Sequence, residues 1–95
     1  MPAYVIAGID VHDGEAYRDY VALVQATIEP FSGRFVVRGG EHETLEGDWR
    51  QHRLVILEFP DADHRRWYAS EGYVEAKAIR QRASDGSLVL VEGAA

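Results

Sequence analysis

The chain has 95 residues, of which 46% are hydrophobic and 27% are charged, and its formal net charge is −6. This length suits a single domain over residues 1–95, and the negative charge argues against nucleic acid as a partner, because phosphate binding requires a basic surface. The chain has no cysteine and no long apolar run, so we expect a cytoplasmic protein without disulfides, signal peptide or membrane-spanning segment.

The first part of the chain predicts a strand, a helix and a second strand. Residues 3–11 alternate and are rich in β-branched side chains, and one side of this strand is wholly apolar. Asp13 is a suitable N-cap for the helix that follows. The apolar stripe of this helix consists of Tyr17, Tyr20, Val21, Val24 and Ile28. Pro30 and Gly33 end the helix, and residues 34–38 form the second strand.

A third strand is predicted at residues 53–59, where Pro60 stops it. Between the second and third strands we expect an extended hairpin. Its turn should lie near Gly47-Asp48, because glycine and aspartate are common in tight turns.

The remaining residues predict two helical segments and a last strand. The helical segments cover residues 61–70 and 70–84, and they are separated by a break, since serine and glycine are weak helix formers. Asp85-Gly86 is expected to form a turn. Residues 87–93 then form the fourth strand.

The order strand, helix, strand, strand, helix, strand is that of the ferredoxin-like βαββαβ fold. We therefore predict an α+β protein whose four-stranded antiparallel sheet carries both helices on one face. The third strand is apolar on both sides, with Leu54 and Ile56 opposed to Val55 and Leu57. Such a sheet needs a cover on its open face. We expect a second copy of the chain there, which gives a homodimer of the dimeric α/β-barrel type.

Five stretches follow one another along the chain: DGEAYRDY, SGRFVVRGGEHETLEGDW, RLVILEFP, RWYASEGY and RQRASDGSLVLVEG. Together they resemble the domain of unknown function 1330 family over nearly the whole sequence. The resemblance implies a small bacterial ferredoxin-like protein that forms a dimeric α/β barrel, and it implies no established reaction. Related barrels include cofactor-independent monooxygenases, dismutase-like enzymes and stress-response proteins, a relation at the level of the fold.

Strand alternation predicts three charged residues on the open face of the sheet. If the apolar side of the first strand faces the helices, then Asp10, Arg38 and Glu58 face away from them. Charges on a half-apolar face should pair or contact a ligand. Arg38 would then anchor a carboxylate or oxyanion, and Glu58 or Asp10 would act as a general base if burial raises its pKa. The alternative is an Arg38–Glu58 ion pair that only stabilises the dimer interface.

Aromatic residues are candidates for the walls of such a ligand-binding pocket. These candidates are Tyr4, Trp67, Tyr68, Tyr73 and Trp49. For Trp67, Tyr68 and Tyr73, however, a place in the core or at an interface is favoured over a cofactor site. Trp49 lies in the hairpin, where one subunit can hardly bury it, so we expect it on the partner subunit or over a pocket mouth.

Metal binding and function remain open to several interpretations. His42 and His52 lie at equal distances from Gly47, so a metal site across the hairpin is conceivable. No compact ligand motif such as HExxH occurs, and we expect neither metal nor cofactor. The leading hypothesis is a cofactor-independent enzyme acting on a small acidic or carbonyl-containing molecule. The alternatives are a non-catalytic small-molecule-binding or stress-associated dimer and a metal-dependent enzyme.

Overall fold

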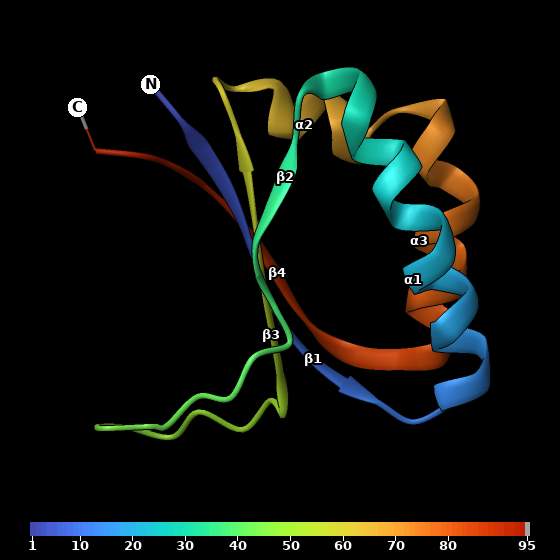
Figure 1. Ribbon diagram of the computed structural model, residues 1–95. Helices are drawn as coiled ribbons and strands as arrows, with labels where there is room; N and C mark the ends of the chain where they lie inside the picture. Colours follow the sequence, from blue (N-terminus) through green and yellow to red (C-terminus); the bar gives the residue numbers. More distant parts are fainter. Residues whose placement is uncertain (95) are drawn as a thin grey trace.

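Four strands form one antiparallel sheet, and the helices pack against one of its faces (Figure 1). The computed structural model describes residues 1–94. In chain order the elements are β1 (Ala3–Val11), α1 (Gly14–Ile28), the 3-10 turn η1 (Glu29–Phe31), β2 (Arg34–Arg38), β3 (Arg53–Phe59), α2 (Asp63–Tyr68), α3 (Glu71–Ala83) and β4 (Ser84–Glu92). The strand order is β2-β3-β1-β4. This topology confirms the α+β, ferredoxin-like fold.

The helices form where caps and apolar stripes predict them. The carboxylate of Asp13 accepts a hydrogen bond from the backbone N–H of Ala16 at 3.1 Å, which caps α1. The buried side chains of α1 are Tyr17, Tyr20, Val24 and Ile28. The expected break in the second helical region is confirmed, since α2 ends at Tyr68 and α3 begins at Glu71. None of the helices described over residues 1–94 is long and apolar enough to cross a membrane.

The hydrophobic core lies between the helices and one face of the sheet. The strands contribute the buried side chains Val5, Ala7, Ile9, Leu57 and Phe59. The ring centroids of Trp67 and Tyr73 lie 4.1 Å apart, and those of Phe59 and Trp67 lie 5.7 Å apart. Burial of each valine, isoleucine, leucine or phenylalanine side chain among them contributes roughly 1.5–3 kcal/mol to folding. The predicted orientation of β1, with its apolar side toward the helices, is confirmed.

The turn predicted at Asp85-Gly86 is wrong. Both residues belong to β4, where Asp85 pairs with Asp10 and Gly86 pairs with Ile9. A Cβ atom at Gly86 would collide with the carbonyl oxygen of Gly8. This glycine therefore permits a close approach of two strands and does not serve a turn. The chain passes directly from α3 into the strand at Ser84, whose backbone is extended.

Residues 39–52, which we call the arm, connect β2 to β3 and extend away from the helices before doubling back (Figure 1). The chain bends at residues 46–47, near the expected turn, and Gly47 has a φ of +83°. Among the described residues, the two limbs of the arm share no strand hydrogen bonds. The expected extended hairpin therefore doubles back near Gly47 but forms no strand ladder, because this charged segment lacks the alternating apolar face that fixes a strand register.

Candidate active site

An extra residue in β2 decides which way Arg38 points. From Phe35 to Val37 the chain of β2 advances by two residues while its pairing with β3 advances by one. Val36 therefore forms a β-bulge, and the alternation of side chains shifts beyond it. Arg38 consequently faces the helices, on the same side as Phe35. The prediction that Arg38 lies on the open face is wrong, because strict alternation takes no account of a bulge.

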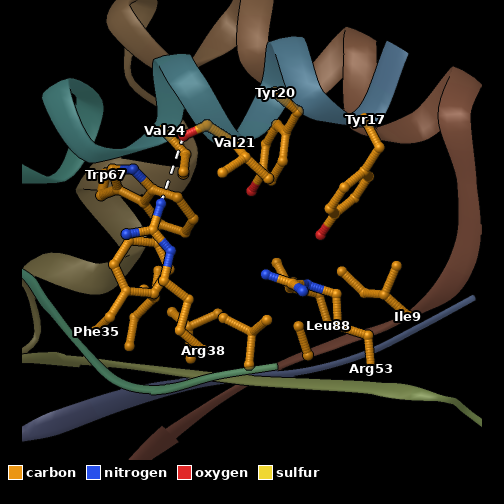
Figure 2. A pocket seen from close by; sticks show the side chains of 14 residues that line it. Ile9, Tyr17, Tyr20, Val21, Val24, Phe35, Arg38, Arg53, Trp67 and Leu88 are labelled. Carbon is orange, nitrogen blue, oxygen red and sulfur yellow. Dashed lines mark hydrogen bonds between the residues drawn. The ribbon is translucent and has the colours of Figure 1, made fainter. Parts of the chain in front are cut away.

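Arg38 and Arg53 enter a pocket between the sheet and α1 (Figure 2). Apolar side chains from both layers line this pocket, among them Ile9, Val24, Phe35 and Trp67. Its polar groups are the two guanidinium groups and the hydroxyls of Tyr17 and Tyr20. The space open to the centre of a water molecule is about 20 Å³, which is room for one or two waters. A larger occupant therefore requires a side chain to move.

Arg38 bridges the side of the pocket from β2 to α1. Its guanidinium lies over the ring of Phe35, 4.0 Å from the ring centroid. Its Nη2 donates to the backbone oxygen of Val21 at 3.5 Å (Figure 2), a long and therefore weak hydrogen bond. Because the side chain is also exposed, Arg38 can move away from Val21 while its stacking on Phe35 keeps it near the pocket.

Arg53 reaches the same pocket from the start of β3 and is more confined. It is half-buried, and its guanidinium carbon lies 5.6 Å from the centroid of the Tyr17 ring. The Arg53 Nε is buried and has no hydrogen-bond partner among residues 1–94. A Cβ at Gly39 would collide with the guanidinium, and Gly39 has a φ of +72°. Glycine at this position therefore leaves the space to Arg53 and permits the left-handed backbone.

Tyr17 and Tyr20 direct their hydroxyls from α1 into the space above the sheet (Figure 2). The Tyr20 hydroxyl lies 2.9 Å from the hydroxyl of Tyr73. Burial raises the pKa of both the Tyr17 and the Tyr20 hydroxyl, and the charge of nearby Arg53 lowers that of Tyr17 in part. Both tyrosines therefore stay protonated at neutral pH and can donate hydrogen bonds into the pocket.

The aromatic residues predicted to bind a ligand occupy different parts of the molecule. Trp67 lines the pocket. Tyr73 is fully buried beside Trp67, and the ring centroids of Tyr68 and Tyr73 lie 6.0 Å apart. Neither of these two tyrosines lines the pocket. Tyr4 lies on the open face of the sheet, and Trp49 lies in the arm with 44% of its surface exposed. The structure therefore brings only Trp67 of this set into the pocket with Arg38.

Glu58 lies on the opposite face of the sheet and is paired there. The Arg34 Nε donates to one carboxylate oxygen at 2.7 Å, and the Tyr4 hydroxyl donates to the other at 3.0 Å. The hydrogen bond from Arg34, followed by that from Tyr4, lowers the pKa of the Glu58 carboxyl. This direction is the reverse of that expected for a buried general base. The pair predicted between Arg38 and Glu58 is also wrong, because Arg34 occupies that position.

Asp10 lies on the open face as well, at the base of the arm. Its carboxylate accepts a hydrogen bond from the backbone N–H of His52 at 2.9 Å, and the ring Nδ1 of His52 lies 2.8 Å away. The backbone hydrogen bond, followed by that from the ring, lowers the pKa of Asp10. The structure therefore does not bring Asp10, Arg38 and Glu58 together, since the sheet separates the arginine from both carboxylates.

The histidines considered as metal ligands border a shallow hollow along the arm. His52 is engaged by Asp10, and the Nδ1 of His42 lies 3.4 Å from the carbonyl oxygen of Gly40. Within residues 1–94, no group of three or more histidine, cysteine, aspartate or glutamate side chains is arranged to hold a metal ion. Two histidines alone offer fewer ligands than a zinc site in a protein uses.

Sequence reasoning misses three polar residues of the pocket, namely Arg53, Tyr17 and Tyr20. Arg53 has the same parity as Val55 and Leu57, so alternation along the strand is a signal that could have placed it on the helix face. Tyr17 and Tyr20 are visible in the sequence only as members of the buried stripe of α1. Their spacing gives no sign that the hydroxyls point into a cavity.

Comparison with known proteins gives a family but no reaction. The family model described as Domain of unknown function (DUF1330) matches residues 2–94. None of the curated proteins matches the chain.

Solved structures share the fold at low sequence identity. RPA0582, a protein of unknown function from Rhodopseudomonas palustris, superposes with a TM-score of 0.77 at 21% identity, over 99% of this chain and 83% of that chain. SnoaB, a cofactor-independent oxygenase from Streptomyces nogalater, superposes with a TM-score of 0.65 at 17% identity, over 99% of this chain and 94% of SnoaB. An antibiotic biosynthesis monooxygenase gives 0.52 at 19% identity, over 98% and 99% of the two chains. These likenesses establish the fold alone.

Proposed function

Because the chain belongs to the domain of unknown function 1330 family, whose description names no reaction, we propose its function from the pocket between the sheet and α1. We propose a cofactor-independent enzyme that acts on a small organic molecule with an acidic or carbonyl group. The observation that carries this proposal is the Arg53 Nε, a buried donor without an acceptor among residues 1–94, in a side chain that lines the pocket. A ligand oxygen would satisfy this donor.

The polar groups of the pocket favour a ligand with negative charge on oxygen. Arg38 and Arg53 present N–H donors, and guanidinium groups form strong charge-assisted hydrogen bonds with carboxylates and oxyanions. The hydroxyls of Tyr17 and Tyr20 add two further groups that can donate. The lining residues, all within the described part of the chain, include no carboxylate and no histidine. An anionic oxygen would therefore meet no negative charge in the lining.

The apolar walls favour a ligand with a compact hydrocarbon body. Side chains such as Ile9, Val24 and Trp67 surround the polar groups, an arrangement typical of small-molecule sites. Because the present space is about 20 Å³, an aromatic or branched acid would have to displace Arg38 from Val21. The exposure of Arg38 and its long hydrogen bond to Val21 support this movement.

The likeness to SnoaB, a cofactor-independent oxygenase, agrees with catalysis on this fold, although fold alone does not determine a reaction. The residues of this chain suggest what the pocket would contribute. The two guanidinium groups would stabilise negative charge that develops on the substrate, and the apolar walls would exclude water and so strengthen that interaction.

The alternative is a non-catalytic pocket that only binds such a molecule, and one observation favours it. The lining contains no carboxylate or histidine among the described residues, and these are the usual general bases. An enzyme built this way requires a substrate that ionises without help. Mass spectrometry of bound compounds after incubation in air separates the two functions, because only an enzyme converts the compound to a product.

Association into a homodimer is the second part of the proposal. The open face of the sheet carries Ile6, Leu54, Ile56, Val89 and Val91. Val89 and Val91 are 54% and 40% exposed in the single chain, and contiguous apolar surface of this kind usually marks an interface. The arm projects on this side of the sheet (Figure 1), where it would contact a second copy of the chain. The lack of cysteine agrees with a cytoplasmic dimer.

Isothermal titration with benzoate tests the pocket. We expect Arg53→Gln to weaken binding roughly tenfold or more, because a hydrogen bond to a charged group is lost. Arg38→Gln should weaken binding as well. The matched control is Arg18→Gln, since Arg18 is exposed on α1 and does not line the pocket. Thermal unfolding of both variants checks that a loss of affinity does not come from a loss of the fold. Equal benzoate affinity in Arg53→Gln and Arg18→Gln would contradict the proposal.

A further inference from the structure

A row of three hydrogen-bonded side chains, Arg80, Tyr73 and Tyr20, leads from α3 to the pocket. The Arg80 Nε donates to the Tyr73 hydroxyl at 3.3 Å, and this hydroxyl lies 2.9 Å from the hydroxyl of Tyr20. Tyr73 is fully buried, and Tyr20 is 8% exposed. Of these three residues only Tyr20 lines the pocket. Tyr20 is therefore the member of this row that a ligand can contact.

The donor role of Arg80 and the full burial of Tyr73 together favour one direction for these hydrogen bonds. A guanidinium group only donates, so the Tyr73 oxygen accepts from Arg80. If Tyr20 also donated to that oxygen, the O–H of Tyr73 would be buried with no acceptor in the described part of the chain, which is unfavourable. If Tyr73 instead donates to Tyr20, the O–H left without an acceptor in the described part of the chain is that of Tyr20. Tyr20 lines the pocket, where water or a ligand can accept from it. The Tyr20 O–H is then free to point into the pocket.

We propose that Arg80 and Tyr73 are positioning residues that turn the Tyr20 O–H toward the pocket, and that Tyr20 thereby selects ligands with an ionised oxygen. This inference rests on the proposed function and narrows its substrate class to phenols, enols and carboxylic acids bound as anions. An anionic oxygen only accepts hydrogen bonds and so matches this donor. An amide or amine N–H in the same place would face another donor and is disfavoured.

The surrounding groups reinforce this selection. Burial raises the pKa of the Tyr20 hydroxyl, so Tyr20 keeps the proton that it donates. Arg38 from β2, Arg53 from β3 and Tyr17 from α1 border the same space. The two positive charges and the Tyr17 hydroxyl favour the same anionic oxygen. The contribution of Tyr20 to anion affinity is therefore measured by comparing Tyr20→Phe with wild type.

The test uses the full chain with 4-nitrophenol, whose phenolate absorbs visible light, and with 4-nitroanisole, a methyl ether of similar shape that cannot ionise. The protein should lower the apparent pKa of bound 4-nitrophenol, seen as increased phenolate absorbance at constant pH. Tyr20→Phe should weaken phenolate binding roughly tenfold or more and raise the apparent pKa of the bound probe. Binding of 4-nitroanisole should stay unchanged, which shows that the pocket is intact.

The two positioning residues have a separate signature. Tyr73→Phe and Arg80→Gln should each lower phenolate affinity by about twofold to threefold. The first removes the hydroxyl that polarises the Tyr20 O–H, and the second removes the charge that polarises the Tyr73 hydroxyl. The control is Arg82→Gln, an exposed arginine near the end of the same helix, which should behave as wild type. If Tyr20 donates to Tyr73 instead, Tyr73→Phe frees the Tyr20 O–H and phenolate affinity rises. That result would overturn the inference.

The remaining outcomes also separate the two proposals. Equal phenolate affinity in wild type and Tyr20→Phe, with 4-nitroanisole bound by both, would overturn the inference and leave the proposed function standing. Failure of the wild-type protein to bind either probe would count against the pocket itself, and the inference would fall with it.

Discussion

Arg34 and Arg53 lie on opposite faces of the same sheet and have opposite surroundings. Arg34 donates to Glu58 at 2.7 Å and is 69% exposed, so its charge is neutralised in a solvated ion pair. Arg53 is half-buried, and its Nε has no partner among residues 1–94. Solvated ion pairs contribute little to stability, whereas an unpaired buried donor is costly unless a ligand or water accepts from it. This contrast supports the proposed ligand at Arg53 and a structural pair at Arg34.

The structural role of Glu58 predicts an acid dependence of stability. Its pKa lies below the ordinary value of 4.5, because Arg34 and Tyr4 donate hydrogen bonds to the carboxylate. The unfolded chain therefore binds the proton more readily, and the stabilisation present above the ordinary pKa is lost as the pH falls through the folded pKa. Glu58→Gln should show a shallower loss of stability than wild type below about pH 4.5.

Urea unfolding at a series of pH values measures this dependence. The control is Glu41→Gln, since Glu41 is exposed in the arm and its replacement should leave the wild-type slope unchanged. A slope in Glu58→Gln that matches wild type across the acid range would contradict the structural role.

Within a single helix or strand, the spacing of apolar residues predicts which side chains are buried. The alternation of β1 places Val5, Ala7 and Ile9 in the core, and the spacing along α1 identifies its buried stripe. Each pattern depends on one segment and on one buried face, so one sequence is enough to predict it.

The bulge in β2 is not predictable in this way. It arises from pairing with β3, and the two residues at the slip, Val36 and Val37, are identical in type, so their order gives no signal. One unpaired residue then moves Arg38 from the open face to the pocket. Asp85-Gly86 fails for a related reason, because a close approach of β1 and β4 requires the glycine. Both errors concern contacts between strands that are distant in sequence.

The two glycines after β2 give a matched test of the space around Arg53. Gly39→Ala should lower the free energy of unfolding by about 1–2 kcal/mol, the usual penalty for a left-handed backbone at a non-glycine residue. It should also weaken benzoate binding, because the new Cβ meets the Arg53 guanidinium. Gly40→Ala should change neither quantity, since a Cβ there meets no atom within 4 Å. Urea unfolding and calorimetric titration of both variants measure the two effects.

Equal losses of stability in Gly39→Ala and Gly40→Ala would show that the arm simply requires flexibility at its first residues. Unchanged benzoate affinity in Gly39→Ala, with the loss of stability present, would remove the link between this glycine and Arg53.

At the scale of the whole molecule, the sheet separates two chemically different faces. On the helical side, two arginines from the strands and two tyrosines from α1 surround an apolar space. The other face holds two carboxylates beside apolar side chains. Asp10 is paired with His52, and Glu58 is paired with Arg34. The chain therefore has a cationic pocket despite a net charge of −6. The pocket face suits a small anion, and the open face suits a second copy of the chain.

The proposed dimer has an expected mass and an expected sensitive position. Light scattering at micromolar concentration should give about twice the chain mass of 10.7 kDa. Ile56→Asp should reduce the mass to that of one chain, because a charge at the centre of an apolar interface remains unpaired. Leu23→Asp is the control, since Leu23 is a 38% exposed apolar residue on α1, on the helical side. A wild-type mass of one chain, or a dimer unaffected by Ile56→Asp, would contradict this interface.

A crystal structure of the protein with bound benzoate tests the proposed pocket most directly. We expect the carboxylate between the sheet and α1, within hydrogen-bonding distance of the Arg53 Nε and the Tyr20 hydroxyl, with Arg38 released from Val21. Benzoate bound on the open face beside Arg34 and Glu58, with the Arg53 Nε still unpaired, would contradict it.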